Sequence, residues 1–328
     1  MIRISQNQSV RDLVANTMEN KRRVADYSNQ LTSGVRAAKP SDSVDAGAIS
    51  RYQQQITKID SYSNVIAQAK SYLDFQDQIV SQANEVMVRA KEIAQQGANE
   101  TLEQTARAQL AQELFQIRDQ MASLANSSYQ GKYVYAGAND ETPPVNQNVY
   151  TEPATGDANK RYSFDTNPAG AIGKNIRLTD EISVSLSTKA DTLFATSMEA
   201  LERLSRALAG YSTTPASGTP DGGGAAYTFP ADAHTQTADI RACIDLIDTA
   251  RNTDLIPERV SIGGRLRRIE TGQALLDLSK NSAKEVLSRL QDADETEAAS
   301  NLQQAQTALQ ASYTVTAKVL RMTILDYI

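Results

Sequence analysis

Cysteine, histidine and tryptophan are almost absent from this chain, which has one Cys, one His and no Trp among 328 residues. The single cysteine, Cys243, excludes an internal disulfide and a thiolate metal site. It lies among apolar residues at helical spacing and is expected to be a small core residue. The single histidine, His234, lies in a stretch typical of a loop, without the neighbouring nucleophile that triad chemistry requires. The sequence therefore predicts a protein that is not an enzyme and uses no cofactor or metal.

Long apolar runs are also missing. No segment reaches the roughly eighteen apolar residues that span a bilayer. The opening residues, MIRISQNQSV, contain no apolar signal core, so we expect a protein that is cytoplasmic or exported without a cleaved signal. The net charge of −6 argues against a nucleic-acid binder. The densest basic cluster, Arg265, Arg267 and Arg268, is interpreted as a solvated helix face.

Aromatic residues make up only 5% of the chain, while alanine, glutamine, serine and leucine are abundant. Such residues lose little freedom in a helix, so the composition favours a mainly α fold with long helices. Residues 10–31 carry a strict heptad pattern. Its two rows are Val10, Thr17, Val24 and Leu31, and Leu13, Asn20 and Tyr27. Because two of these positions are polar and three heptads are marginal in water, this helix is expected to need a partner.

A longer helical pattern extends from about residue 43 to 96. Its main apolar row recurs every seven residues and comprises Tyr52, Ile59, Ile66, Leu73, Val80, Met87 and Ala94. Gly97 is interpreted as a left-handed stop, and Thr101 with Gln104 as a capping box that starts a helix at about 101–128. A short turn between two such helices predicts an antiparallel pair.

The composition changes at residue 131. Residues 131–137 favour β structure, and residues 138–189 hold most of the turn signals, which predicts a small β-rich domain inserted between helices. Short strands are expected at 149–150, 161–164 and 182–186. The helical pattern returns near residue 191, and the segment 211–237, rich in Gly, Pro, Ser and Thr, is interpreted as a mobile loop.

From residue 239 to the end the pattern is almost wholly helical. Gly263 and Gly264 mark either a kink or a close helix contact, and the sequence leaves both open. Past residue 290 the apolar row comprises Leu302, Ala305, Leu309, Tyr313, Thr316, Leu320 and Ile324. The rest of this helix is nearly uncharged, which suits the interior of an assembly better than solvent.

The simplest closed arrangement brings the two terminal helices together in one long antiparallel helical bundle or coiled-coil rod. The expected parts are an N-terminal assembly helix at 1–42, a rod from 43–130 and 191–288, the inserted domain at 131–190, and a C-terminal assembly helix at 289–328. The rod core is expected to include Ile59, Ile66, Leu73, Leu110, Leu114 and Ile117. The assembly interface is expected to include Val10, Leu13, Val24, Leu31, Leu302, Leu309, Leu320 and Ile324. An ordinary bundle that buries these side chains internally is an equally good interpretation.

Two stretches near opposite ends of the chain resemble the flagellin superfamily. One is residues 29–36, NQLTSGVR, followed by Pro40-Ser41-Asp42 and Ala46. The other is residues 288–294, SRLQDAD, followed by Glu297-Ala298. Two signatures in the right order are more specific than either alone. Within the superfamily, residues 2–5, 131–137 and 323–328 are similar to the branch that joins the flagellar hook to the filament.

The resemblance implies a structural adaptor whose terminal helices become ordered in the assembled flagellum, outside the cell. It also implies export through the flagellar type III channel without a cleaved signal. The implied partners are the preceding hook-associated protein, flagellin on the filament side, further copies of the chain in a ring, and an export chaperone at the C-terminal helix.

Two other interpretations stay open. Flagellin itself would differ in copy number more than in physics, and a cytoplasmic coiled-coil scaffold would share the heptads. The acidic group Asp292, Asp294, Glu295 and Glu297 is compatible with a cation site, but its helical spacing is more typical of a solvated surface.

Overall fold

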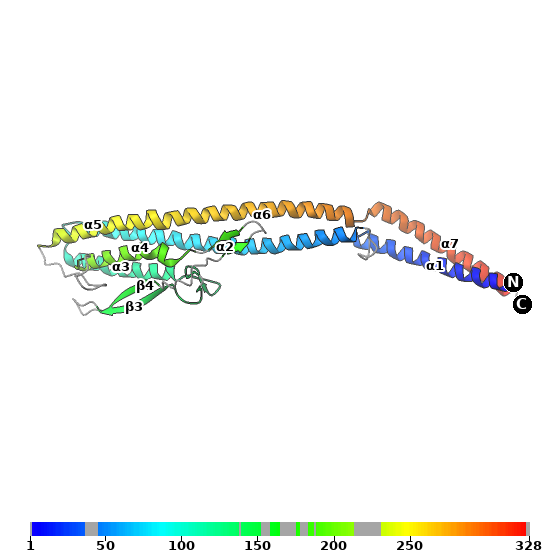
Figure 1. Ribbon diagram of the computed structural model, residues 1–328, viewed down its shortest axis with the longest axis horizontal. Coiled ribbons are helices and arrows are strands. Elements are labelled where there is room, and N and C mark those ends of the chain that lie inside the picture. The colour runs from blue at the N-terminus through cyan, green and yellow to red at the C-terminus, as the bar shows by residue number, and fades with distance from the viewer. Residues whose placement is uncertain are drawn as a thin grey trace. The chain divides into compact units, whose positions relative to one another are not determined.

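The computed structural model describes residues 2–36, 45–137, 139–151, 158–164, 175–177, 183–186, 188–212 and 231–325, with the side chains of 2–7, 9–10, 147–151, 158–161 and 320–325 outside the description. The chain divides into two compact units. Unit 1 comprises Met1–Ser61 and Leu275–Ile328, and unit 2 comprises Tyr62–Ala274. Two long helices, α2 (Ala46–Gly97) and α6 (Ile256–Gln291), contribute residues to both units, and each unit is described by itself (Figure 1).

Unit 1 is built from both ends of the chain. The terminal helices α1 (Ile2–Ser33) and α7 (Glu295–Leu325) lie side by side (Figure 1). The first part of α2 and the last part of α6 complete the unit, and Lys280 Nζ lies 2.5 Å from Asp60 Oδ1 between them. The prediction that both chain ends contribute to one helical bundle is confirmed.

Unit 2 holds the well-packed core. It contains the remainder of α2, α3 (Gln104–Ala125), α4 (Ala190–Ala209), α5 (Ala233–Thr249) and the start of α6, with α3 and α5 both packed on α4. Its fully buried side chains include Leu73, Val80, Met87, Leu114, Met121, Phe194, Leu201, Leu204, Ile240 and Ile247. The predicted mainly α fold class is confirmed, and the seven-residue row of α2 is buried from Ile59 onward.

A π-helical turn, η3 (Ala250–Leu255), joins α5 to α6. Pro257 lies two residues further on, and its ring clashes with the carbonyl of Thr253 in a regular α-helix. A π turn widens the helix at this point and relieves that clash. The π turn also keeps one helix face buried. Ala250 and Leu255 are five residues apart, Ile262 follows seven residues later, and all three are buried.

The inserted segment forms three two-stranded antiparallel sheets among the described residues. They pair β1 (Ser128–Tyr129) with β2 (Lys132–Tyr133), β3 (Val145–Thr151) with β4 (Ala158–Phe164), and β5 (Asn175–Arg177) with β6 (Ser183–Ser185). The first hairpin turns through Gln130 and Gly131, both with positive φ, as a type I′ turn requires. The predicted strands at 149–150 and 161–164 lie inside β3 and β4, and the one at 182–186 contains β6.

Side chains of α2 hold the inserted segment in place. The Tyr72 hydroxyl donates to the Val134 carbonyl at 3.1 Å, and Gln76 Nε2 donates to the Leu186 carbonyl at 3.1 Å. Tyr135 is 1% exposed and packs edge-on against Phe194, with 5.1 Å between ring centroids. Burial, followed by the charge of Asp140, raises the pKa of Tyr72 to about 12. The β-favouring residues 131–137 are therefore mostly buried connection and only briefly strand.

Both predictions for the turn between α2 and α3 are wrong. Gly97 does not have a positive φ; it is required because a Cβ there would overlap Leu208 Cδ2. α3 begins at Gln104, and its N-cap, Glu103, makes no capping hydrogen bond from its side chain. The Thr101 hydroxyl instead donates to Asn99 Oδ1 at 2.9 Å. Packing of Gly97 against Leu208 of α4, and not a local capping motif, therefore fixes this turn.

Two further details concern the glycine pair of α6 and the start of α5. α6 continues through Gly263 and Gly264, and a Cβ at either would meet no atom of the described chain within 4 Å, so close packing inside the described molecule does not explain the pair. The predicted loop at 211–237 is wrong at its end, because α5 begins at Ala233 and residues 233–237, His234 among them, are helical; residues 213–230 lie outside the description. Across the described residues, no helix combines the length and apolarity that membrane crossing requires.

Candidate assembly interface

The two terminal helices form an antiparallel pair with a partly polar seam. Asn20 Nδ2 donates to Ser312 Oγ at 2.7 Å, and Thr17 Oγ1 lies 3.5 Å from Thr316 Oγ1. The partner's number falls as the α1 number rises, which fixes the antiparallel direction. The two polar seam positions that the heptad pattern identified therefore meet polar residues of α7.

This pair leaves its apolar side chains incompletely covered. Among the described side chains of α1 and α7, the buried apolar residues are the small Ala298 and Ala305, at 3% and 6% exposure. The larger seam residues are half-buried: they are Leu13, Val24, Tyr27, Leu302, Leu309 and Val319. Two helices can cover only one stripe of each other, so surface that a larger bundle would bury stays open to solvent.

Other apolar side chains on these helices are exposed. Met18 is 68% exposed, Val14 42%, Tyr313 52% and Val315 47%, and Leu31, which the heptad placed in the seam, is 41% exposed. The predicted α7 row was wrong at Tyr313, because Ser312 takes the seam position opposite Asn20. The described range does not include the side chains of three predicted interface residues, Val10, Leu320 and Ile324.

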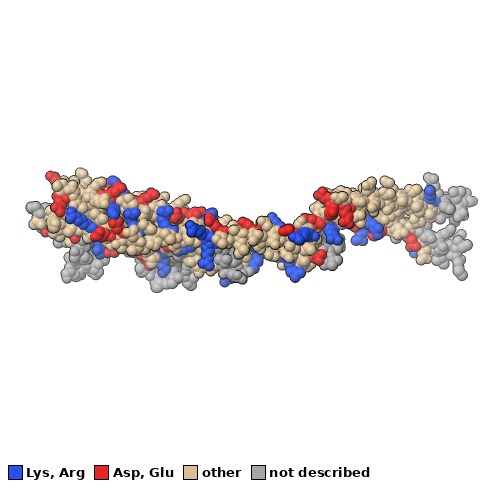
Figure 2. Space-filling view, turned by 90° about the horizontal axis from the view of Figure 1, so that it is seen from above, with Lys and Arg blue, Asp and Glu red and all other residues tan. Residues whose placement is uncertain are grey.

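The surface of α7 is unusually poor in charge. The sequence has no Asp, Glu, Lys or Arg between Glu297 and Lys318. Figure 2 shows the acidic group at the start of α7 followed by a largely uncharged surface, whereas charges of both signs are mixed over other parts of the molecule. An uncharged helix surface loses little hydration when another protein covers it.

The two sequence signatures from opposite chain ends meet in unit 1. Val35 and Asp292 form an isolated antiparallel bridge. The Arg36 N–H donates to the Gln291 carbonyl at 2.8 Å, and the Ala293 N–H donates to the Gly34 carbonyl at 2.9 Å. Gly34 has a φ of +70°, which glycine adopts without strain. The signature residues thus join the end of α1 to the link between α6 and α7.

The acidic group at this link is structural as well as exposed. Asp294 Oδ1 accepts hydrogen bonds from the N–H groups of Thr296 and Glu297, at 2.8 and 3.1 Å, and so caps the first turn of α7. The Ser288 hydroxyl donates to Asp292 Oδ2. The interpretation as plain solvated surface missed this cap, although an Asp just before an acidic helical turn is a recognisable signal.

The residues expected in the rod core lie mostly in the interior. Leu73 and Leu114 are fully buried, Ile59, Ile66 and Ile117 are between 3% and 7% exposed, and Leu110 is half-buried. Cys243, 2% exposed, packs in unit 2, where burial raises the pKa of its thiol to about 12. Their side chains therefore serve packing within the chain.

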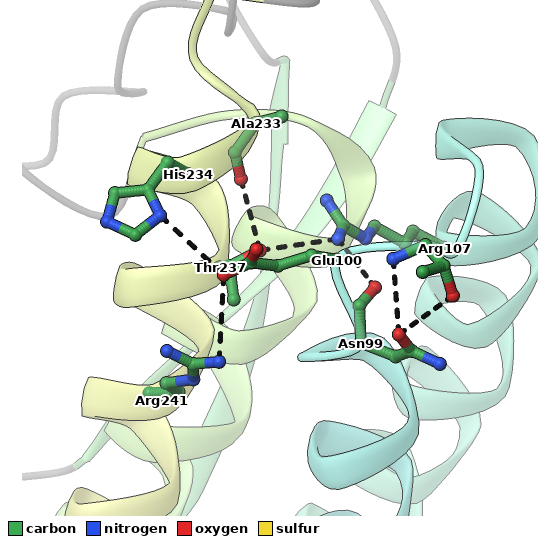
Figure 3. Close-up of polar contacts among 8 residues, drawn as sticks. Asn99, Glu100, Arg107, Ala233, His234, Thr237 and Arg241 are labelled. Atoms are coloured by element: carbon green, nitrogen blue, oxygen red, sulfur yellow. Dashed lines mark hydrogen bonds and ion pairs between the residues drawn. The ribbon is translucent and has the colours of Figure 1, made fainter.

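A buried polar cluster ties together the helix ends at one end of unit 2 (Figure 3). Arg107 is 2% exposed, and its guanidinium donates to the Asn99 carbonyl at 2.9 Å, to Thr237 Oγ1 at 3.3 Å and to Gln236 Oε1. Gln236 Nε2 also donates to the Ala207 carbonyl at 2.7 Å. Desolvation lowers the pKa of Arg107, against the opposing charge of Glu100.

The exposed rim of this cluster carries the only histidine of the chain. His234 Nδ1 and Arg241 NH2 lie 3.6 and 3.7 Å from Glu100 Oε1 (Figure 3). No group of metal-ligating residues occurs among the described side chains. The hydrogen bonds of this cluster connect α3, α4 and α5 with the turn that follows α2, which is typical of a structural packing network.

Sequence comparisons place both ends of the chain in one family. The family described as bacterial flagellin N-terminal helical region matches residues 4–140, and the bacterial flagellin C-terminal helical region matches residues 244–328. The chain is 29% identical over 126 residues to flagellar hook-associated protein 3 of Escherichia coli, covering 37% of this chain and 39% of that protein. It is 32% identical over 123 residues to the Salmonella typhimurium protein of the same name, covering 36% and 38%. These alignments span about two fifths of each relative.

The fold is similar to that of solved hook-associated proteins. A crystal structure of flagellar hook-associated protein 3 from Legionella pneumophila superimposes with a TM-score of 0.58 at 16% identity, covering 74% of this chain and 98% of that one. At this identity the likeness shows the fold, in which long helices from both chain ends enclose an inserted segment.

Proposed function

Because this chain belongs to the flagellin superfamily, we propose that it is a structural subunit of the bacterial flagellum, acting as an adaptor at the hook–filament junction. The observation that carries the proposal is the incomplete coverage of the α1/α7 pair. Its larger seam residues are half-buried, and Met18 and Tyr313 beside the seam are more than half exposed. The name of the two aligned relatives, hook-associated protein 3, supports the junction over the filament.

In this proposal neighbouring subunits complete the burial of the terminal helices. Full burial of a Leu, Ile or Val side chain is worth about 1.5–3 kcal/mol, so a few half-covered residues per chain give a strong drive to associate. The proposed contact set is Val10, Leu13, Val24, Leu31, Leu302, Leu309, Leu320 and Ile324. The uncharged stretch of α7 supports this role because little charge has to be desolvated.

The proposed partners follow the order of the assembly. One side of a ring of these subunits would contact the preceding hook-associated protein, and the other would contact the first flagellin subunits. Before that, an export chaperone would hold the C-terminal helix, and the chain would leave the cell through the flagellar export channel without a cleaved signal. The role is structural, with no catalytic step and no cofactor.

Deletion of residues 319–328 tests the contribution of α7. Unit 2 should keep its thermal unfolding transition, because its buried core does not include these residues, whereas filament assembly should stop. The measurement is motility and electron microscopy of a strain that carries only the truncated protein. Normal motility would contradict the proposal, and the full-length protein expressed from the same plasmid is the control.

Copy number separates the junction role from that of flagellin. A junction ring needs few copies per flagellum, whereas a filament needs thousands, so quantitative mass spectrometry of sheared flagella distinguishes them. Absence of the protein from sheared flagella would instead favour the cytoplasmic coiled-coil scaffold.

A further inference from the structure

The seam between α1 and α7 contains a polar layer, formed by Asn20 and Ser312, where leucine would be expected. Asn20 Nδ2 donates to Ser312 Oγ at 2.7 Å, and both residues are half-buried. Continuing the heptad spacing in both directions places Val24 opposite Leu309 on one side and Leu13 near Val319 on the other. The polar layer is therefore flanked by apolar layers on both sides.

The direction of this hydrogen bond is fixed by the hydroxyl of Ser312. That hydroxyl has one hydrogen, which it donates to the Ala308 carbonyl of its own helix at 2.8 Å. Its oxygen can then only accept across the seam, so Asn20 must present its NH2 group. The bond requires a donor on α1 and a free acceptor on α7.

The neighbouring polar contact does not share this property. Thr17 Oγ1 donates to the Leu13 carbonyl at 2.8 Å, and Thr316 Oγ1 donates to the Ser312 carbonyl at 2.7 Å. Both hydroxyl hydrogens are thus used within their own helices, and the 3.5 Å contact between the two oxygens is not a hydrogen bond across the seam. Among the described seam residues, Asn20 and Ser312 make the directional contact.

The apolar layers determine the alignment of the two helices only in part. If α7 slipped by one heptad, Val24 would exchange Leu309 for Leu302, an equivalent partner, although Leu13 would then face Ser312. The same slip would place Asn20 opposite Ala305, and the opposite slip would place it opposite Val319, and neither side chain can accept a hydrogen bond. A half-buried amide without a partner is unfavourable, so only one alignment satisfies the seam.

We propose that the Asn20–Ser312 hydrogen bond is a specificity determinant of the terminal helices: it acts with the backbone pairs at Val35 and Asp292 to select one alignment of α1 with α7 over slipped pairs. A parallel pair of α1 helices would place Asn20 beside Asn20, whose side-chain carbonyl can accept, so this bond does not exclude that pair. The bond lowers the stability of the seam relative to leucine and gives one register in return. The biological importance of this selection rests on the proposed assembly function.

Disulfide trapping in the purified full-length protein tests the alignment. In a background with Cys243→Ala, the pair Val24→Cys with Leu309→Cys reports the native register, and Val24→Cys with Leu302→Cys reports a slip of one heptad. With Asn20 present, we expect the native cross-link to dominate. Adding Asn20→Leu should raise the slipped cross-link by roughly tenfold, because no amide then needs an acceptor.

Matched variants separate specificity from general stability. Asn16→Leu makes the same substitution at an exposed position of α1 and should leave the native register unchanged. The exchange Asn20→Ser with Ser312→Asn restores one donor and one acceptor and should recover the native cross-link. Circular dichroism checks that every variant remains helical.

Three outcomes would overturn the proposal. They are an unchanged cross-link pattern in Asn20→Leu, an equal slip in Asn16→Leu, or no native cross-link in the parent protein, which would mean that α1 and α7 do not select each other. Because the experiment uses purified protein, its failure is distinguishable from failure of the flagellar role, which motility and the composition of sheared flagella report.

Discussion

The helices of unit 2 and the α1/α7 pair are built from the same residue types at the same heptad spacing, yet they differ in how far burial is completed. In unit 2, Leu73, Leu114 and Leu201 are fully buried in the helical core. In the terminal pair, Leu13 and Leu309 occupy equivalent heptad positions and remain half-exposed. The difference shows that heptad periodicity identifies which face of a helix is covered but not how completely. How completely that face is buried depends on the number of neighbouring helices.

Substitutions in the two regions should therefore have unequal effects on the isolated chain. Leu73→Ala should destabilise unit 2 by about 3 kcal/mol, because it leaves a cavity in a closed core. Leu309→Ala should cost only about 1 kcal/mol in the monomer, since its side chain is already partly hydrated. Chemical denaturation followed by circular dichroism measures both, and equal losses would remove the contrast between the regions.

Two glycines sharpen the comparison of closed and open surfaces. Gly97→Ala should destabilise unit 2 by about 1–3 kcal/mol, because the new methyl group overlaps Leu208. Gly263→Ala, at an exposed helical position with no neighbour within 4 Å, should stabilise the chain by about 0.5–1 kcal/mol. Thermal unfolding measures the two shifts, and shifts of the same sign would contradict the packing described for Gly97.

The smallest effect on the monomer is expected at the exposed apolar residues of α1. Met18→Ser should change the free energy of unfolding by less than about 0.5 kcal/mol, because the side chain is 68% exposed. If this surface is reserved for neighbouring subunits, the same substitution should still weaken self-association. Sedimentation velocity over a concentration series measures that change, with the exposed polar substitution Gln304→Ser as the control.

Several features followed from the sequence alone because they depend on local pattern. The seven-residue row of α2 predicted its buried face, and the heptad of residues 10–31 identified Thr17 and Asn20 as polar seam positions. The signatures around Gly34 and Asp292 indicated the family before any contact was known. Periodicity and composition are properties of one segment, so one segment suffices to read them.

Other features required the folded chain because they depend on residues far apart in sequence. Helical periodicity allowed Tyr313 in the α7 seam, but packing against α1 selected Ser312. Gly97 is set by Leu208, a hundred residues away, and the guanidinium of Arg107 is buried because Gln236 and Thr237 lie across from it. The amino-acid pattern is enough to show which helix faces are apolar and roughly where the helices lie. Which of those faces meet depends on the folded chain, since a hydrogen bond or an overlap is defined by both partners and not by either alone.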